Sequence, residues 1–279
     1  SKRFNRIIHS SNRRRGGAAA AAFTPSDIDG LLQFLESDTG VTAPTDDKVT
    51  VWADEQSGDD RDVTQTSDAS RPVETASIFD TNPGLLFDGD NDRLDRANES
   101  SGGINFNYDD PFYVIVGIQM ASDFDATAGA VGELAGQFGT SNPAGWVVRY
   151  DAAGKPFIGL QASYGAGTYT WVHGDTVLAA STKYLIEFWN TAATGQGDAS
   201  NLDIAVNGAA ESLTTVNDGL STNSIVSTNP YNIGERHDGA HAVDGYYACV
   251  GIYGSVPNTD ERISLRSYLN DKYGFTDDA

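Results

Sequence analysis

The sequence predicts an all-β protein: an antiparallel β-sandwich with an extended N-terminal arm and a short C-terminal helix. Short runs rich in Val, Thr, Tyr and Phe alternate with Gly, Asn, Asp and Ser, a pattern typical of many strands joined by turns. No helical pattern separates these runs, which argues against an α/β sheet. The length of 279 residues suits one sandwich domain with a full core.

The expected strands begin at residue 112. Residues 112–119 are almost entirely apolar and predict a buried strand. Residues 145–151 and 156–162 flank a short turn and predict a hairpin. Residues 202–206 alternate in polarity and end at Asn207-Gly208, a strong hairpin signal. Further strands are expected over residues 167–172, 183–189, 231–234 and 243–253.

The two ends of this body differ from its middle. Residues 259–273 predict a helix that is capped by Thr259 and ends at Gly274. Its apolar side is expected to contain Ile263, Leu265, Leu269 and Tyr273. Residues 25–36 stay ambiguous, because Thr24-Pro25 is typical of a helix start whereas residues 31–35 also suit a buried strand.

Charge divides the chain into a basic segment and an acidic body. The first 15 residues contain no acid and six basic residues, namely Lys2, Arg3, Arg6, Arg13, Arg14 and Arg15. The other 12 basic residues stand against all 39 acids, which gives the body a formal charge of −27. We therefore expect no binding of the body to an anionic membrane or to nucleic acid. No apolar stretch reaches the roughly 20 residues of a membrane helix.

The acidic surface has two interpretations. Asp outnumbers Glu by 30 to 9, and Arg outnumbers Lys by 13 to 5. Such a surface repels itself at low salt, and molar salt screens it because the Debye length falls to about 3 Å. A halophilic or marine source is one interpretation. An ordinary acidic protein that its charge keeps soluble is the other.

We divide the chain into an arm, residues 1–23, and one domain, residues 24–279. The arm resembles a signal peptide, but its apolar part of about six residues is shorter than such signals require. We expect it to be an assembly arm that docks on a partner or a sister copy through Arg3, Arg6, Arg13, Arg14 and Arg15. Phosphate contacts to nucleic acid, packing on its own domain and disorder are the alternatives.

Several short blocks of residues occur in a fixed order along the body of the chain. Residues 51–58 hold a Trp-x-Asp turn that ends in Ser-Gly, and residues 86–94 hold a Phe-Asp-Gly strand followed by an acidic turn. The other blocks are Thr64-Gln65, Arg71-Pro72, residues 232–236, Asp244-Gly245, residues 251–253 and residues 268–274. These blocks and their order over about residues 50–275 resemble the concanavalin A-like (laminin-G-like) jelly-roll superfamily of lectins and glucanases, and the resemblance implies its jelly roll. One detail departs, because Cys249 or its neighbours stand where the family commonly has an acid.

An Arg-rich arm followed by such a domain also resembles structural proteins of tailed bacterial and archaeal viruses. This resemblance implies a non-enzymatic virion protein, such as a capsid decoration, turret or fibre-base subunit, assembled in the host cytoplasm. It implies a homo-oligomer that the arm anchors to other virion proteins and that contacts host surface glycans. A free or cell-surface glycan-binding lectin is the alternative, and a glycoside hydrolase is the second alternative.

We predict no catalytic residues. The glucanases that resemble this chain carry a Glu-x-Asp-x-x-Glu string, because retaining hydrolysis needs two carboxyls about 5–5.5 Å apart. No such string exists here, and Glu187 and Glu235 are isolated acids. His173 lies near no nucleophile motif, and His237 and His241 have zinc-like spacing but lie in a loop-like stretch.

Two ligand sites are predicted. Asp88, Asp90 and Asp92 crowd oxygen ligands of the kind that calcium prefers. A hairpin turn with solvated acids is the alternative, and no other cofactor is expected. The aromatic residues Trp146, Tyr164, Tyr169 and Trp171 are candidates for stacking on a glycan, with packing in the core or at a sheet edge as the alternative.

Overall fold

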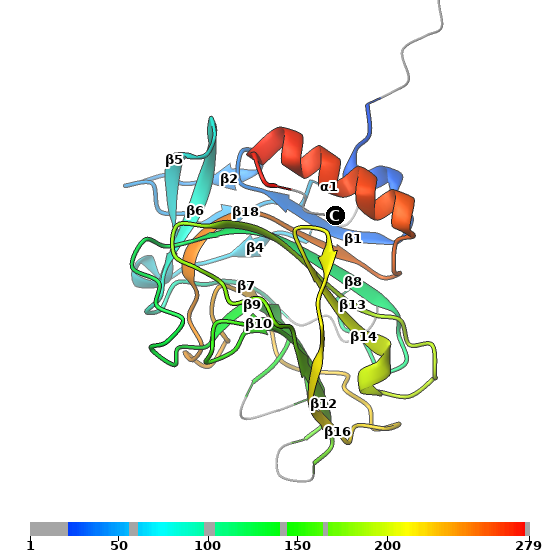
Figure 1. Cartoon of the computed structure of the whole chain (residues 1–279). Coiled ribbons are helices and arrows are strands. Elements are labelled where there is room, and N and C mark those ends of the chain that lie inside the picture. The colour runs from blue at the N-terminus through cyan, green and yellow to red at the C-terminus, as the bar shows by residue number, and fades with distance from the viewer. Residues whose placement is uncertain (1–21, 56–60, 98–103, 140–143, 164–166, 277–279) are drawn as a thin grey trace, which may run out of the picture.

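Two antiparallel sheets pack face to face, and one helix covers the outer face of one sheet (Figure 1). The computed structural model describes residues 22–55, 61–97, 104–139, 144–163 and 167–276. This arrangement confirms the predicted antiparallel sandwich with a C-terminal helix. The division at residue 23 stays a prediction. Among the described residues, no helix is long and apolar enough to cross a membrane.

The first sheet has eight strands. Its order is β15 (Ala209–Ala210), β14 (Leu202–Val206), β13 (Lys183–Asn190), β8 (Phe112–Met120), β18 (Asp244–Tyr253), β6 (Asn82–Asp88) and β5 (Val73–Phe79), with β1 (Leu31–Glu36) paired to β18. Strand β8 is central, because it hydrogen-bonds to β13 on one side and to β18 on the other.

The second sheet has ten strands. Its order is β16 (Thr214–Asp218), β12 (Tyr169–His173), β11 (Pro156–Gln161), β10 (Gly145–Tyr150), β9 (Gly132–Gly136), β17 (Tyr231–Ile233), β7 (Leu94–Arg96), β4 (Val63–Thr64), β3 (Val51–Trp52) and β2 (Val41–Thr42). The predicted hairpin is formed by β10 and β11, whose register pairs Gly145 with Gln161.

The burial of each strand explains whether its sequence is a continuous apolar run or alternates between apolar and polar residues. Phe112 and Val114 of β8 lie between the sheets, whereas Tyr113 and Ile115 face the helix on the other side. Strand β8 is therefore buried on both faces and reads as one apolar run. On β10, by contrast, only alternate side chains enter the core, and Arg149 points away from it.

Helix α1 (Thr259–Tyr273) has the predicted bounds, but its N-cap lies one residue earlier than expected. Asn258, not Thr259, is the N-cap, because its side chain accepts a hydrogen bond from the Glu261 amide. Gly274 ends the helix in the left-handed conformation, as predicted. Ile263 was expected on the apolar side, but its side chain is 46% exposed.

The ambiguous segment near residue 30 contains both predicted elements. A short 3₁₀ helix, η1 (Pro25–Asp27), follows Thr24, whose backbone N–H donates to the Asp27 carboxylate at 2.7 Å. Strand β1 then begins at Leu31. Two other 3₁₀ turns, η2 (Asp68–Ser70) and η3 (Ala199–Asn201), lie in connections.

The Trp-x-Asp block that suggested a known superfamily has a structural role. Trp52 is fully buried, and its indole N–H donates to the Glu36 carbonyl at 2.9 Å. Asp54 accepts a hydrogen bond from the Phe34 amide at 2.9 Å. The block therefore ties β3 to β1. Membership of the concanavalin A-like superfamily itself stays a prediction.

A buried ion pair joins α1 to the eight-stranded sheet. Arg266 of the helix lies 3.1 Å from Glu187 of β13, and both side chains are at most 8% exposed. Tyr113 of β8 donates to the other Glu187 oxygen at 2.8 Å. Both oxygens of the isolated strand acid therefore have partners beneath the helix.

Removing one partner of this pair should destabilise the protein strongly. Arg266→Met would leave the buried Glu187 without its counter-ion, and we expect a loss of about 3–5 kcal/mol in the free energy of unfolding. The double variant Glu187→Met/Arg266→Met should recover a large part of that loss, because no buried charge then remains. Urea denaturation measures both. Equal stabilities of the single and double variants would contradict this account.

Candidate functional site

The outward face of the ten-stranded sheet carries a cluster of aromatic and charged side chains. Helix α1 lies against the other sheet and leaves this face uncovered by any described helix (Figure 1). Alternation along the strands brings the cluster together: Arg149 of β10, Phe157 of β11 and Trp171 of β12 lie on adjacent strands and point to the same side.

Four side chains of this cluster contact one another. The rings of Tyr169 and Trp171 are half-buried and have centroids 4.4 Å apart. Phe157 packs edge-on against Trp171 at 5.5 Å. The Arg149 guanidinium lies 4.1 Å above the Phe157 ring and 5.3 Å from the Trp171 ring. The indole is therefore held from two sides while part of it stays accessible to solvent.

Gly159 allows the indole to lie close to the sheet. It pairs with Trp171 across β11 and β12. A Cβ atom at this position would come within 2.8 Å of Trp171 Cδ1 and 3.0 Å of Phe157 Cε1. A larger residue at Gly159 would therefore displace the aromatic cluster.

Beside these rings lie polar atoms that have no hydrogen-bond partner among the described residues. Gln161 is 1% exposed, and both atoms of its amide lack a hydrogen bond within the described part of the chain. The same holds for Trp171 Nε1 and for Asn217 Oδ1, whose residue pairs with Trp171 on β16. Leaving such groups unpaired costs about 1–3 kcal/mol each. Their atoms are buried from solvent, so a sugar could reach them only if the surrounding side chains moved.

A buried carboxyl stands on the next strand. Glu133 of β9 pairs with Arg149 in the sheet register and is 0% exposed. One oxygen accepts from the Asn232 amide at 2.8 Å, and the other has no hydrogen-bond partner among the described residues. Burial raises the pKa of Glu133 to about 7, against the opposing effects of Asn232, Arg236 and Arg149.

The loop after β17 packs over this carboxyl. Its His241 carbonyl accepts from the Glu133 amide at 2.7 Å. Arg236 donates to Asp238 at 2.7 Å and to His241 Nδ1 at 3.3 Å. Burial, together with Arg236, lowers the pKa of His241 to about 4, so its imidazole is neutral near pH 7. His237 donates to the Phe138 carbonyl at 3.0 Å.

The predicted glycan residues have three different outcomes. Tyr169 and Trp171 come together on the outward face. Trp146 does not join them: it is 0% exposed, it packs between the sheets, and its indole N–H donates to the Ile104 carbonyl at 2.8 Å. A side chain in the core presents no face to a sugar, so that assignment is wrong. Tyr164 lies outside the described residues.

The predicted calcium ligands lie in a tight turn and bond to its backbone. Asp88 accepts from the amides of Asp90 and Asn91, and Asp92 accepts from the Asp88 amide at 3.1 Å. Burial and the charge of Asp88 raise the pKa of Asp92 to about 7. No three His, Cys, Asp or Glu side chains of the described ranges form a metal-holding group. Calcium binding stays a prediction here.

Sequence reasoning missed Arg149, Phe157, Gln161 and Glu133. The alternation in residues 156–161 is a usable signal, because Phe157, Gly159 and Gln161 then share one face. The contact between Glu133 and Asn232 joins residues far apart in the chain, and no local pattern reveals it. The five arginines predicted to form an assembly arm lie outside the described residues.

No family model matches the sequence, and no curated protein matches it. The fold is similar to the binding domain of Paraclostridial Mosquitocidal Protein 1, with 13% identity and a TM-score of 0.60 over 88% of this chain and 54% of that chain. The Botulinum neurotoxin serotype G binding domain gives 12% and 0.52 over the same shares, 88% and 54%. A Trypanosoma rangeli sialidase in complex with 2,3-difluorosialic acid gives 15% and 0.50 over 89% of this chain and 34% of the sialidase.

These likenesses show a shared β-sandwich fold. The chain spans about half the length of the two toxin binding domains and about a third of the sialidase. At such low identity, they assign no activity and no residue to this protein. The predicted β-sandwich is therefore a fold that this chain shares with two toxin binding domains.

The raised pKa of Glu133 predicts how stability depends on pH. The folded protein holds this proton up to about pH 7, whereas the unfolded chain releases it near pH 4.5, the group's ordinary pKa. The stabilising contribution is therefore complete below pH 4.5 and is lost as pH rises through 7. Glu133→Gln should show a flatter decline of unfolding free energy between pH 5 and 8.

Urea denaturation at several pH values measures this effect. Asp90→Asn removes an exposed carboxylate and serves as the matched control, which should follow the wild-type profile. If Glu133→Gln and the wild type decline in parallel, the carboxyl does not carry the titration.

Proposed function

We propose that this chain is a non-enzymatic glycan-binding domain whose site is the outward face of the ten-stranded sheet. The observation that carries the proposal is the pair Tyr169 and Trp171, two half-buried rings 4.4 Å apart on one face of β12. Sugars present apolar C–H faces that stack on such rings, and their hydroxyls hydrogen-bond to nearby polar groups. Polar side chains flank the pair in the sheet register, with Gln161 opposite Tyr169 and Asn217 opposite Trp171.

The fold likenesses support this choice among the functions that the sequence suggested. They include two binding domains of toxins and a sialidase solved with a sialic acid derivative. The glycan-binding alternative therefore has more support than the virion role.

The proposal that the domain is not an enzyme rests on the engagement of its acids. Glu187, the strand acid that a glucanase reading would use, is paired to Arg266 and Tyr113 beneath α1. Glu133 lies on the glycan face but is fully buried. Neither of these two carboxyls is exposed to a substrate on this face.

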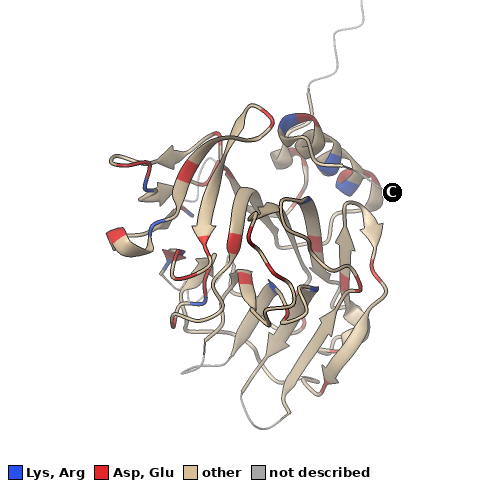
Figure 2. Cartoon of the chain, turned by 60° about the vertical axis from the view of Figure 1, so that its left-hand side comes forward, with Lys and Arg blue, Asp and Glu red and all other residues tan. Residues whose placement is uncertain are grey.

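A virion structural role is a second, separate proposal. Its support is the basic composition of residues 1–15 against an acidic body, whose Asp and Glu positions are spread over both sheets and their loops (Figure 2). Attachment to other virion proteins, location in a virion and a halophilic source belong to this proposal. Contact with host surface glycans would join it to the first.

Removing the indole should abolish most of the binding. We expect Trp171→Ala to weaken binding to the best glycan found by array screening at least tenfold, about 1.4 kcal/mol, because the stacking face is lost. Gly159→Val should have a similar effect by displacing the ring. Titration calorimetry with the same glycan measures both losses.

Tyr246→Ala is the matched control. Tyr246 is a half-buried aromatic residue on β18 of the other sheet, so its removal should leave glycan affinity unchanged. Thermal unfolding of each variant separates loss of the site from loss of the fold. Equal affinity of Trp171→Ala and wild type for every glycan bound would place the site elsewhere.

A further inference from the structure

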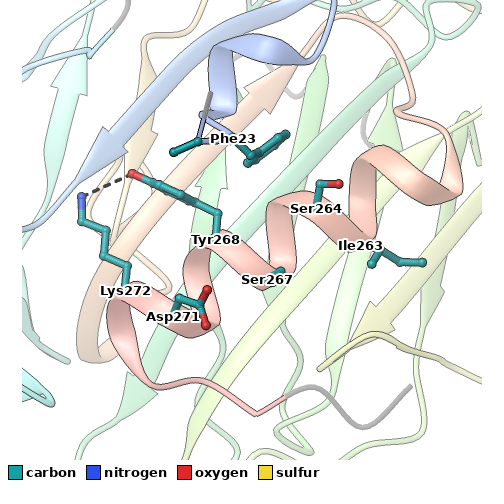
Figure 3. Close-up of a pocket in the computed structure, with 8 residues that line it drawn as sticks. Phe23, Ile263, Ser264, Ser267, Tyr268, Asp271 and Lys272 are labelled. Atoms are coloured by element: carbon teal, nitrogen blue, oxygen red, sulfur yellow. Dashed lines mark hydrogen bonds between the residues drawn. The ribbon is translucent and has the colours of Figure 1, made fainter. Parts of the chain in front are cut away.

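A groove runs along α1 on the side of the molecule opposite the glycan face. Its volume is about 700 Å³, and its walls are the chain entering the domain and the exposed side of the helix (Figure 3). It is lined by Ala22, Phe23, Ile263, Ser264, Ser267, Tyr268, Asp271 and Lys272. A smaller cavity of about 270 Å³ adjoins it at Tyr268 and includes Glu36 and Glu55.

The helix side of this groove has an apolar centre and acidic surroundings. Ile263, Ser267 and Asp271 recur every four residues and are exposed, so they form one stripe along α1. Ile263 is one of the few large apolar side chains that the described part of the chain exposes. The small Ser264 and Ser267 leave room for backbone to approach between Ile263 and Phe23.

The charged residues near the groove leave it net acidic. Lys272, its basic residue, is paired to Glu36 and Asp38 at 3.0 Å each. Asp271 and Glu55 bring further negative charge. A ligand suited to this surface is therefore basic, and it includes small apolar residues that fit beside the serines.

The chain itself supplies a segment with this chemistry. Residues 1–21 lie outside the described structure and end where the groove begins, at Ala22. They carry six basic residues, no acid and the run Ala18–Ala21. Fully extended, 21 residues span up to about 70 Å, more than the roughly 50 Å diameter expected for a domain of this size.

We propose that the groove along α1 binds the basic N-terminal segment of a second copy of this chain. Ala22 and Phe23 of one copy already form a wall of its groove, which leaves the space beside α1 for the segment of a neighbouring copy. Two copies placed with their α1 grooves side by side can exchange segments symmetrically. The attraction between a basic segment and a body of charge −27 favours this exchange.

Cross-linking between differently labelled copies tests the occupant directly. Full-length Ala20→Cys and full-length Ser267→Cys are mixed and treated with a short bis-maleimide. The native Cys249 is fully buried and does not compete. We expect a product of twice the chain mass that contains one copy of each variant. The double variant Ala20→Cys/Ser267→Cys, treated alone, reports linkage within one chain. Linkage only within that double variant, or no linkage, would overturn the proposal.

Solution mass of the full chain tests the surface independently. We expect wild type to form a defined oligomer by light scattering, and Ser267→Trp, which fills the groove at an exposed position, to be monomeric. Arg13→Glu/Arg14→Glu/Arg15→Glu should also be monomeric, because the segment loses its basic charge. Ala210→Trp, on the exposed edge strand β15, is the control and should keep the wild-type mass.

The contrary results are equally clear. A monomeric wild type, or an oligomer that Ser267→Trp leaves intact, would refute docking in the groove. Glycan affinity of Ser267→Trp should equal that of wild type, because the groove and the aromatic pair lie on different sheets. The proposal on assembly therefore succeeds or fails separately from the proposed glycan binding.

Discussion

The pairing of β8 with β13 and β18 is the interaction on which the rest of this structure depends. Strand β8 is hydrogen-bonded along its length on both edges, and its side chains are buried on both faces. Its inward residues hold the second sheet, and its outward residues hold α1. One strand therefore gives the sandwich a covered side and an open side. The candidate glycan face is on the open side because the helix is committed to the other.

The covered side is fastened by charge as well as by apolar packing. Arg266 reaches Glu187 on β13, and Lys272 reaches Glu36 on β1. Burial raises the pKa of Glu36, an effect that Lys272 opposes. In a chain with 39 acids and 18 basic residues, these contacts orient the helix by placing scarce cations over particular strand acids. Such pairs contribute less to net stability than to a single orientation of the helix, since desolvation offsets much of their attraction.

Much of the fold could be predicted from the sequence, whereas the site could be predicted only in part. The apolar run of β8 and the turn residues around β10 and β11 act locally, so pattern alone places them. Trp146 shows the limit of prediction from residue type. Its indole suggested a surface for stacking on a sugar, but alternation along β10 places Trp146 in the core and Arg149 on the opposite face. The polar contacts of Glu133 depend on residues about a hundred positions away, and only the assembled sheet creates them.

The candidate glycan face and the α1 groove lie on opposite sides of the molecule, so one can be occupied without covering the other. A domain that binds single glycan units through one aromatic pair gains only modest affinity, because a shallow face buries little area. Copies joined through the α1 side would present several such faces at once, and avidity rises steeply when linked sites can engage together. In this proposed arrangement, like charge would keep the acidic bodies apart, and the basic segment would provide the attraction that selects one contact. The proposed oligomer would therefore raise the avidity of a glycan face whose single-site affinity is modest.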